Sequence, residues 1–110
     1  MEEIETVTTE AFLSSKFFNN SKINYAENII KYNNNHKAIS FYSEIDSYER
    51  HFTWKELSES VDKLSYYFTN NVKIKSKDRI AAVLPNIPET IISFLASAKV
   101  GAIWSSCSAD

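Results

Sequence analysis

Residues 79–110 constrain the fold more than any other stretch, because they form a complete strand, helix and strand pattern with a boundary at each end. Residues 79–84 are a short apolar run that ends at Pro85, which has no backbone N–H to donate to a ladder. Gly101, the only glycine of the chain, closes the helix, because the residue after a helix often needs a positive φ. Residues 102–108 form the second strand. This order predicts two parallel strands joined by a helix.

The helix of this unit has a predicted start at Asn86. The side-chain oxygen of Asn86 and the carboxylate of Glu89 have the spacing that satisfies the free N–H groups of a first turn reciprocally. Pro88 falls in the first turn, where its missing donor costs nothing. Apolar residues occupy more than one stripe of the helix, which predicts that other structure covers most of it. They are Ile87, Ile91, Ile92, Phe94, Leu95 and Ala98.

A longer helix is predicted from Thr53, which forms a capping box with Glu56. Apolar residues then follow at steps of three and four, at Trp54, Leu57, Val61, Leu64 and Phe68. Asn70 or Asn71 is expected to end the helix in the left-handed conformation. The charges of this helix are expected to form its solvated face, at Lys55, Glu56, Glu59, Asp62 and Lys63.

The N-terminal part of the chain is more weakly patterned. Asn24 and Glu27 have the spacing of a cap for a short helix over residues 24–32, which the asparagines at 33–35 end. Residues 10–18 predict one or two further helical turns, anchored against a larger body by Phe12, Leu13, Phe17 and Phe18.

Between the two capped helices, residues 37–43 alternate in polarity, with Ile39 and Phe41 on one face, as in a strand. Residues 50–52 are expected to return as a short antiparallel partner, which makes a hairpin with an exposed edge. The predicted order is therefore helix, hairpin, helix, strand, helix, strand. It indicates one α/β domain with a parallel pair, joined by a right-handed crossover from residue 84 to residue 102.

Composition narrows the classes of function. The chain has 110 residues, enough for one modest domain, and a formal net charge of -2 with no basic stripe, which argues against nucleic-acid and anionic-membrane partners. The acidic N-terminus lacks the pattern of a secretory signal, so we expect a cytoplasmic protein. Cys107 is the only cysteine, which excludes an internal disulfide or a cysteine-based metal cluster. His36 and His51 lack metal-ligand spacing, and we expect solvated rings.

The carboxyl ends of the two predicted parallel strands are the one physical pointer to a ligand site, because ligands of open α/β sheets gather there. These ends are residues 85–86 and 105–110. Ser105 and Ser106 are nevertheless expected to be sheet residues before they are substrate contacts, and Cys107 a small buried residue before it is a nucleophile. Trp104 either lines an acyl pocket or fills the core, and the core is the favoured interpretation. Asn86 is a cap first, although a helix N-terminus can also hold an anion.

Three stretches, NYAEN at residues 24–28, FTWKEL at residues 52–57 and the whole of residues 79–110, resemble in order and spacing the start of the adenylate-forming acyl-CoA synthetases. The resemblance covers residues 24–110. Within that family, the ending IWSSCS is similar to members that use acetoacetate, whereas those that use acetate or propionate usually carry a histidine-containing run there. Two family glycines are missing, near Asn71 and Lys77, and Ala109 stands where a proline is usual.

The resemblance implies a partial N-terminal subdomain of the adenylate-forming fold, with residues 1–23 as an N-terminal extension of the large AMP-dependent ligase domain. It also implies a reaction of the whole enzyme in which ATP, Mg²⁺, coenzyme A and acetoacetate give acetoacetyl-CoA. The phosphate loop and the catalytic lysine of the family lie beyond the matched stretches, so we expect no catalytic residue and no activity in this chain. Trp104, Ser105 and Ser106 remain as the neighbourhood of the substrate pocket. The alternatives are part of an acetate or propionate synthetase, or a non-catalytic interaction module.

Overall fold

The structure is a computed structural model that describes residues 20–45 and 47–109. In chain order the elements are α1 (Tyr25–Ile30), β1 (Lys37–Tyr42), β2 (Glu49–Thr53), α2 (Trp54–Tyr67), the π-helical turn η2 (Phe68–Val72), β3 (Arg79–Val83), α3 (Pro88–Lys99) and β4 (Ile103–Cys107). This order confirms the predicted sequence of elements and the α/β class. The expectation for residues 10–18 lies outside the described residues.

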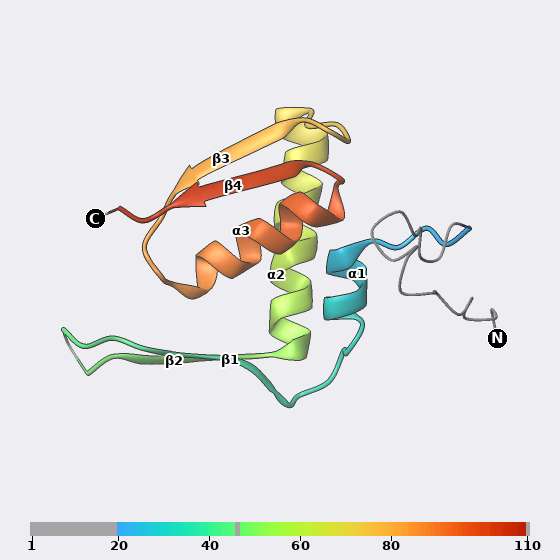
Figure 1. The fold of residues 1–110 in the computed structure, drawn as a ribbon. Helices are drawn as coiled ribbons and strands as arrows, with labels where there is room; N and C mark the ends of the chain where they lie inside the picture. The colour runs from blue at the N-terminus through green and yellow to red at the C-terminus, as the bar shows by residue number, and fades with distance from the viewer. Residues whose placement is uncertain (1–19, 46, 110) are drawn as a thin grey trace, which may run out of the picture.

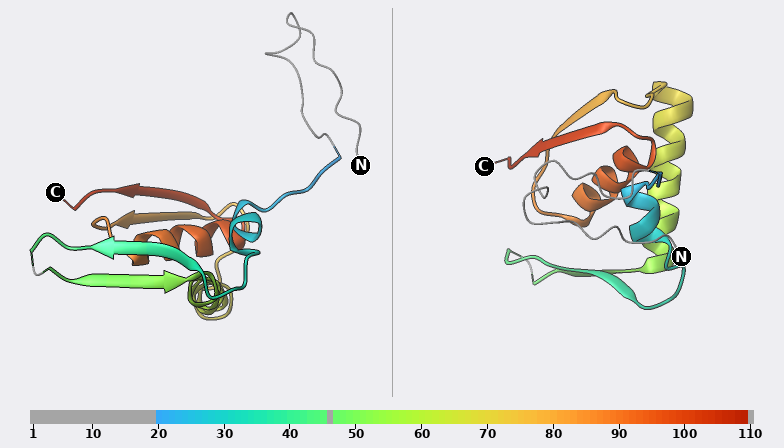
Figure 2. Two further views of the ribbon diagram at one scale, coloured as in Figure 1. Left: turned by 90° about the horizontal axis from the view of Figure 1, so that it is seen from below. Right: turned by 45° about the vertical axis from the view of Figure 1, so that its right-hand side comes forward.

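Helix α3 lies between two separate two-stranded sheets (Figure 1). The β1–β2 hairpin runs along one side of α3, and the β3–β4 pair covers the other side. Helix α2 runs beside all three layers, and α1 packs next to α2 and α3, as the second set of views shows (Figure 2). The hairpin therefore projects from the body as an arm that is rooted at the start of α2.

The hairpin is antiparallel, as predicted, and pairs Phe41 with Arg50 and Tyr42 with Glu49. Its register shifts between Lys37 and Ile39, which is a β-bulge at the root. Ile39 and Phe41 are half-buried, whereas the residues between and after them are exposed, so the predicted alternation of faces is confirmed.

Helix α2 supplies the centre of the core. Thr53 and Glu56 form the predicted capping box, in which each side chain accepts from the other residue's backbone N–H. Leu57 and Val61 lie on the buried face, and Leu95 of α3 packs in the same cluster. This core is small and unites the helices, since its buried apolar members are Ala26, Ile30, Leu57, Val61, Ile92, Leu95 and Ala96.

Helix α1 begins at the predicted cap, and that cap also holds the end of α3. Asn24 Oδ1 accepts from the N–H of Glu27 at 3.2 Å. Its amide Nδ2 donates to the carbonyls of Ala98 at 3.0 Å and Lys99 at 3.2 Å. These carbonyls belong to the last turn of α3, where C=O groups have no N–H donor within the helix. One side chain therefore joins two helices that lie far apart in the sequence.

Strands β3 and β4 are parallel, as predicted, and pair Arg79 with Ile103 and Val83 with Cys107. Helix α3 covers one face of this pair, while Val83 and Ile103 on the opposite face are 67% and 53% exposed. Cys107 is also exposed, so the prediction of a buried cysteine is wrong. The physical reason is strand alternation, which places Cys107 on the face of Ile103, and no described residue buries it there. Helix α3 itself is only partly covered, since Ile91 is 43% exposed.

The chain leaves α2 through η2, and this corrects a second expectation. Asn70 and Asn71 lie inside the π-helical turn, and the left-handed residue is Lys73, with φ 65°. Lys77 is also left-handed, with φ 73°, and it donates its N–H to the carbonyl of Gly101 at 2.8 Å. Gly101 has the predicted positive φ, 77°, and a Cβ there would stand 2.9 Å from Ser76 Oγ. Among residues 20–45 and 47–109, no helix combines the length and apolar content needed to cross a lipid bilayer.

Candidate functional site

The start of α3 differs from the prediction. The N-cap residue is Ile87, with φ −126° and ψ 161°, and no side chain caps the helix. Pro88 explains the change, because the residue before a proline is disfavoured in the helical region and Ile87 therefore stays extended. Helix α3 begins at Pro88 itself, which confirms the expected proline in the first turn. Asn86 then lies before the cap and Glu89 is too early for a capping box.

Glu89 instead bonds to the hairpin. Arg50 Nη2 of β2 lies 2.6 Å from Glu89 Oε1. This hydrogen bond is the main reason that the pKa of Glu89 is lowered from its ordinary value, and it raises the pKa of Arg50. The guanidinium also lies over the ring of Phe52, 5.1 Å from its centroid. The second oxygen of Glu89, Oε2, is a buried atom with no hydrogen-bond partner among the described residues.

The carboxyl ends of β3 and β4 lie next to each other, as the parallel register requires. The N–H of Leu84 donates to the carbonyl of Cys107 at 3.2 Å, which continues the pairing one step beyond β3. The carbonyl of Pro85 accepts from the N–H of Ile87 at 2.9 Å and from Thr90 Oγ1 at 2.7 Å. Residues 84–87 are thus a loop that both β4 and α3 hold in place.

The three residues predicted near the substrate pocket do not all point the same way. Trp104 is half-buried against Phe94 of α3, with ring centroids 6.3 Å apart, and its Nε1 donates to Ser106 Oγ at 3.2 Å. Strand alternation places Trp104 and Ser106 on the α3 side and Ser105 on the exposed side. Phe94 also contacts Tyr25 of α1 at 5.7 Å, so a row of three aromatic rings joins α1, α3 and β4.

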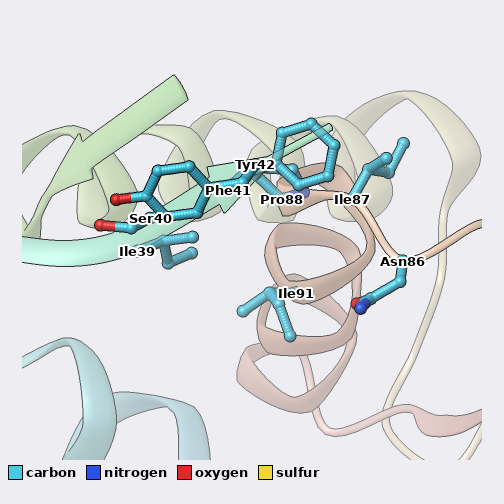
Figure 3. A pocket seen from close by; sticks show the side chains of 8 residues that line it. All are labelled: Ile39, Ser40, Phe41, Tyr42, Asn86, Ile87, Pro88 and Ile91. Atoms are coloured by element: carbon cyan, nitrogen blue, oxygen red, sulfur yellow. The ribbon is translucent and has the colours of Figure 1, made fainter. Parts of the chain in front are cut away.

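A shallow groove of about 240 Å³ separates the hairpin from the start of α3. Four consecutive residues of β1 line one side of it, so the edge of the strand faces the groove. Residues from the loop and first turns of α3 line the other side (Figure 3). The full lining is Ile39, Ser40, Phe41, Tyr42, Asn86, Ile87, Pro88 and Ile91. Its wall combines apolar side chains with polar groups, among them the hydroxyls of Ser40 and Tyr42 and the amide of Asn86.

Among the described residues, neither of the two histidines lines this groove. His36 and His51 are exposed, as expected, and His51 contacts Ser40 Oγ at 3.0 Å and the carboxylate of Glu49. Within residues 20–45 and 47–109, no group of three or more histidine, cysteine, aspartate or glutamate side chains is placed to hold a metal ion.

The sequence did not predict two contacts of this region. Asn24 was expected to cap α1 only, and Glu89 was expected to bond to Asn86. In both cases the second partner lies far away in the chain, and neither contact has a local spacing that would reveal it. Glu89 does follow a proline directly, and that proline is the signal that a cap at Asn86 would fail.

The arrangement is that of an α/β subdomain built from a hairpin, a core of helices and a parallel strand pair. Residues 27–110 match the family described as AMP-binding enzyme. This match covers well over half of the chain, and the chain therefore belongs to the AMP-binding enzyme family.

Named relatives show which members of this family the chain resembles. The chain is 40% identical over 104 residues to acetoacetyl-coenzyme A synthetase of Rhizobium meliloti, across 94% of this chain and 16% of that protein. It is 39% identical over 97 residues to acetoacetyl-CoA synthetase of Xenopus tropicalis, across 86% of this chain and 14% of that protein. The chain thus spans only about one seventh of the length of these relatives.

Solved structures agree with the fold. Acetoacetyl-CoA synthetase from Streptomyces lividans superposes with a TM-score of 0.74 at 29% identity, across 84% of this chain and 15% of that chain. The acyl-CoA synthetase of Brucella canis superposes with a TM-score of 0.68 at 25% identity, across 74% and 15%. Both likenesses support the predicted adenylate-forming fold.

Proposed function

We propose that this chain is the N-terminal portion of an ATP-dependent acetoacetate–CoA ligase of the cytoplasm. The observation that carries the proposal is the 40% identity that runs through 94% of the chain to an acetoacetyl-coenzyme A synthetase. The IWSSCS run that begins at β4, on which the resemblance to acetoacetate-using members rests, lies within residues 27–110, the stretch that matches the AMP-binding enzyme family. Its small-molecule substrates are acetoacetate, ATP and coenzyme A.

The proposed reaction has two steps. A carboxylate oxygen of acetoacetate attacks the α-phosphorus of ATP, pyrophosphate leaves, and an acyl-adenylate forms. The thiol of coenzyme A then attacks the acyl carbon, loses its proton, and AMP leaves as acetoacetyl-CoA forms. The described residues hold no cluster that suits Mg²⁺, so no step in this chain is assigned to the metal. We assign no catalytic group to this chain.

The role proposed for these residues is to shape one side of the substrate pocket. Trp104 is fixed by Phe94 and bonded to Ser106, and this pair lies toward α3. Ser105 presents its hydroxyl on the opposite face. An indole that is held on two sides is a rigid wall, which suits discrimination between acyl groups of different size.

A second candidate is part of an acetate-using ligase. One observation favours it: the chain is 35% identical over 94 residues to acetyl-coenzyme A synthetase of Helicobacter pylori. The identities of 40% and 39% to the acetoacetyl-CoA synthetases of Rhizobium meliloti and Xenopus tropicalis favour acetoacetate as the substrate.

An exchange of segments tests the proposal and separates the two substrates. Residues 20–109 replace the superposed segment of the Streptomyces lividans synthetase, and the Helicobacter pylori segment replaces it in a matched chimera. We expect the first chimera to retain thioester formation with acetoacetate over acetate, and the second to lose that preference. A folded first chimera that prefers acetate would contradict the proposal.

The chain alone provides a complementary test. We expect the 110 residues to form no thioester from acetoacetate, ATP and coenzyme A, because the family's phosphate loop is missing from them. Measurable turnover would overturn the assignment of the chemistry to other parts of a ligase. A non-catalytic interaction module would also be inactive alone, but it would not sustain activity in the first chimera.

A further inference from the structure

The Arg50–Glu89 ion pair joins the projecting hairpin to α3. Its side chains are only 32% and 45% exposed, and the guanidinium also contacts the Phe52 ring. A charge pair that is partly shielded from water interacts more strongly than a fully exposed one. Arg50 is further oriented by an aromatic face, so less side-chain freedom is lost when the pair forms.

The pair acts at a distance from the root of the hairpin. At the root, the N–H of Trp54 donates to the carbonyl of His36 at 3.0 Å, and the N–H of Lys55 to that of Asn34 at 3.0 Å. The tip is exposed, with Ile45 at 89%. Arg50 pairs with Phe41 between the root and the tip. A contact at that point lies farther from the root and therefore restrains a swing of the arm more than contacts at the root do.

The other partner of the pair stands next to the ligand edge of the sheet. Glu89 follows residues 84–87 directly, and this loop is bonded to β4 through Leu84 and Cys107. No side chain caps α3, so its first turn has the Thr90 Oγ1 bond to the Pro85 carbonyl but not the capping box that α2 has. The bond from Arg50 supplies a restraint at that place from outside the helix.

We propose that Arg50 and Glu89 form a latch that holds the hairpin beside α3 and keeps residues 84–87 fixed at the carboxyl end of β3. Both are positioning residues. The importance of this loop for a substrate rests on the proposed function, but the latch is a property of the chain itself.

Spin labels at two exposed positions measure the latch directly. Cys107 is a natural label site, and Ile45→Cys adds a second site at the tip of the hairpin. Double electron–electron resonance then gives the distribution of distances between the tip and β4. We expect a narrow distribution in the parent and a broader one in R50Q and in E89Q. The charge exchange R50E/E89R should narrow it again.

The helix offers a matched control at its other end. Lys99 Nζ lies 2.5 Å from Asp62 Oδ1 of α2, and these side chains are 30% and 54% exposed. Asp62→Asn therefore removes an ion pair of similar exposure from the same helix without touching the hairpin. The latch predicts no broadening in this variant. Equal broadening in Asp62→Asn, or no broadening in R50Q and E89Q, would overturn the proposal.

Amide exchange provides a readout for the loop without labels. The N–H groups of Leu84 and Ile87 should exchange about threefold faster in E89Q than in the parent, as the loss of a partly exposed ion pair allows. Unchanged exchange would refute the effect on the loop. Both measurements use the 110-residue chain without ATP, acetoacetate or coenzyme A, so their outcome does not depend on whether the ligase assignment holds.

Discussion

The starts of α2 and α3 have the same pattern, a capping residue followed three positions later by glutamate, yet only one of them forms a capping box. At α2, Thr53 and Glu56 bond to each other's backbone. At α3, Asn86 is not the cap, and Glu89 bonds to Arg50 instead. The residue that separates the two cases is Pro88, which holds the preceding residue in an extended conformation. One start is therefore determined locally, and the other depends on a neighbouring element.

The largest expected effect on stability comes from the hydrophobic core that α2 and α3 share. Leu57 of α2 and Leu95 of α3 are 2% and 3% exposed in the same core. Leu57→Ala and Leu95→Ala should each lower the free energy of unfolding by about 2–5 kcal/mol, because each leaves a cavity. Urea unfolding monitored by circular dichroism measures both. A much smaller effect at Leu95 would mean that α3 is held less firmly than α2 by the core as well as at its start.

The next largest effect on stability distinguishes Thr53, which caps α2, from Asn86, which does not cap α3. Thr53→Ala should cost about 1 kcal/mol of unfolding free energy, because it removes the acceptor for the Glu56 N–H. Asn86→Ala should change it by less than about 0.5 kcal/mol, because Asn86 is exposed and lies outside the helix. The same urea titrations compare the two variants. Equal losses of unfolding free energy in the two variants would contradict the proposed difference between the starts of α2 and α3.

A third prediction concerns the proline itself. In Pro88→Ala, Ile87 is free to become helical, and Asn86 then takes the N-cap position that Pro88 denies it. Asn86→Ala should now cost about 1 kcal/mol in that background, although it costs little in the parent. A double-mutant cycle measures this coupling, and the backbone chemical shifts of Ile87 report the change of conformation. If the cycle shows no coupling, Pro88 is not the reason that Asn86 fails to cap α3.

These cases show which parts of the fold the sequence could predict. Several features whose partners lie within a few residues were predicted correctly, such as the Thr53 cap and the positive φ of Gly101. The left-handed residue after α2 was predicted at the wrong position. The helix continues as η2, so Lys73 adopts the left-handed conformation instead of Asn70 or Asn71. Local spacing gives no information on how far a helix runs before it changes its hydrogen-bond pattern.

The candidate site was less predictable than the fold, because burial depends on what covers a strand. The rule for parallel sheets predicted a ligand edge, but it could not show that Trp104 packs on Phe94 of α3 and bonds to Ser106 while Ser105 faces away. Cys107 was expected to be buried and is exposed, since no described residue covers that face. The Arg50–Glu89 contact joins residues far apart in the chain, so it required the tertiary structure.

The smallest effect lies in the titration of the two glutamates. Backbone and side-chain hydrogen bonds from Thr53 lower the pKa of Glu56, and the hydrogen bond from Arg50 lowers the pKa of Glu89. A pKa that is lower in the folded state adds stability above the unfolded value of about 4.5, and this stability is lost as the pH falls through the lowered value.

Carbon NMR of the two carboxyl groups should separate the causes. Thr53→Ala should return the pKa of Glu56 only part of the way toward its ordinary value, because the backbone N–H of residue 53 remains, and it should leave the pKa of Glu89 unchanged. Arg50→Gln should return the pKa of Glu89 toward its ordinary value and leave that of Glu56 unchanged. Salt adds a further contrast, because 1 M salt, with a screening length of about 3 Å, weakens a partly exposed ion pair more than hydrogen bonds from neutral donors. The pKa of Glu89 should therefore rise more with salt than that of Glu56. If both rise equally, the restraint at the start of α3 is not mainly ionic, and the two helix starts differ less than their partners indicate.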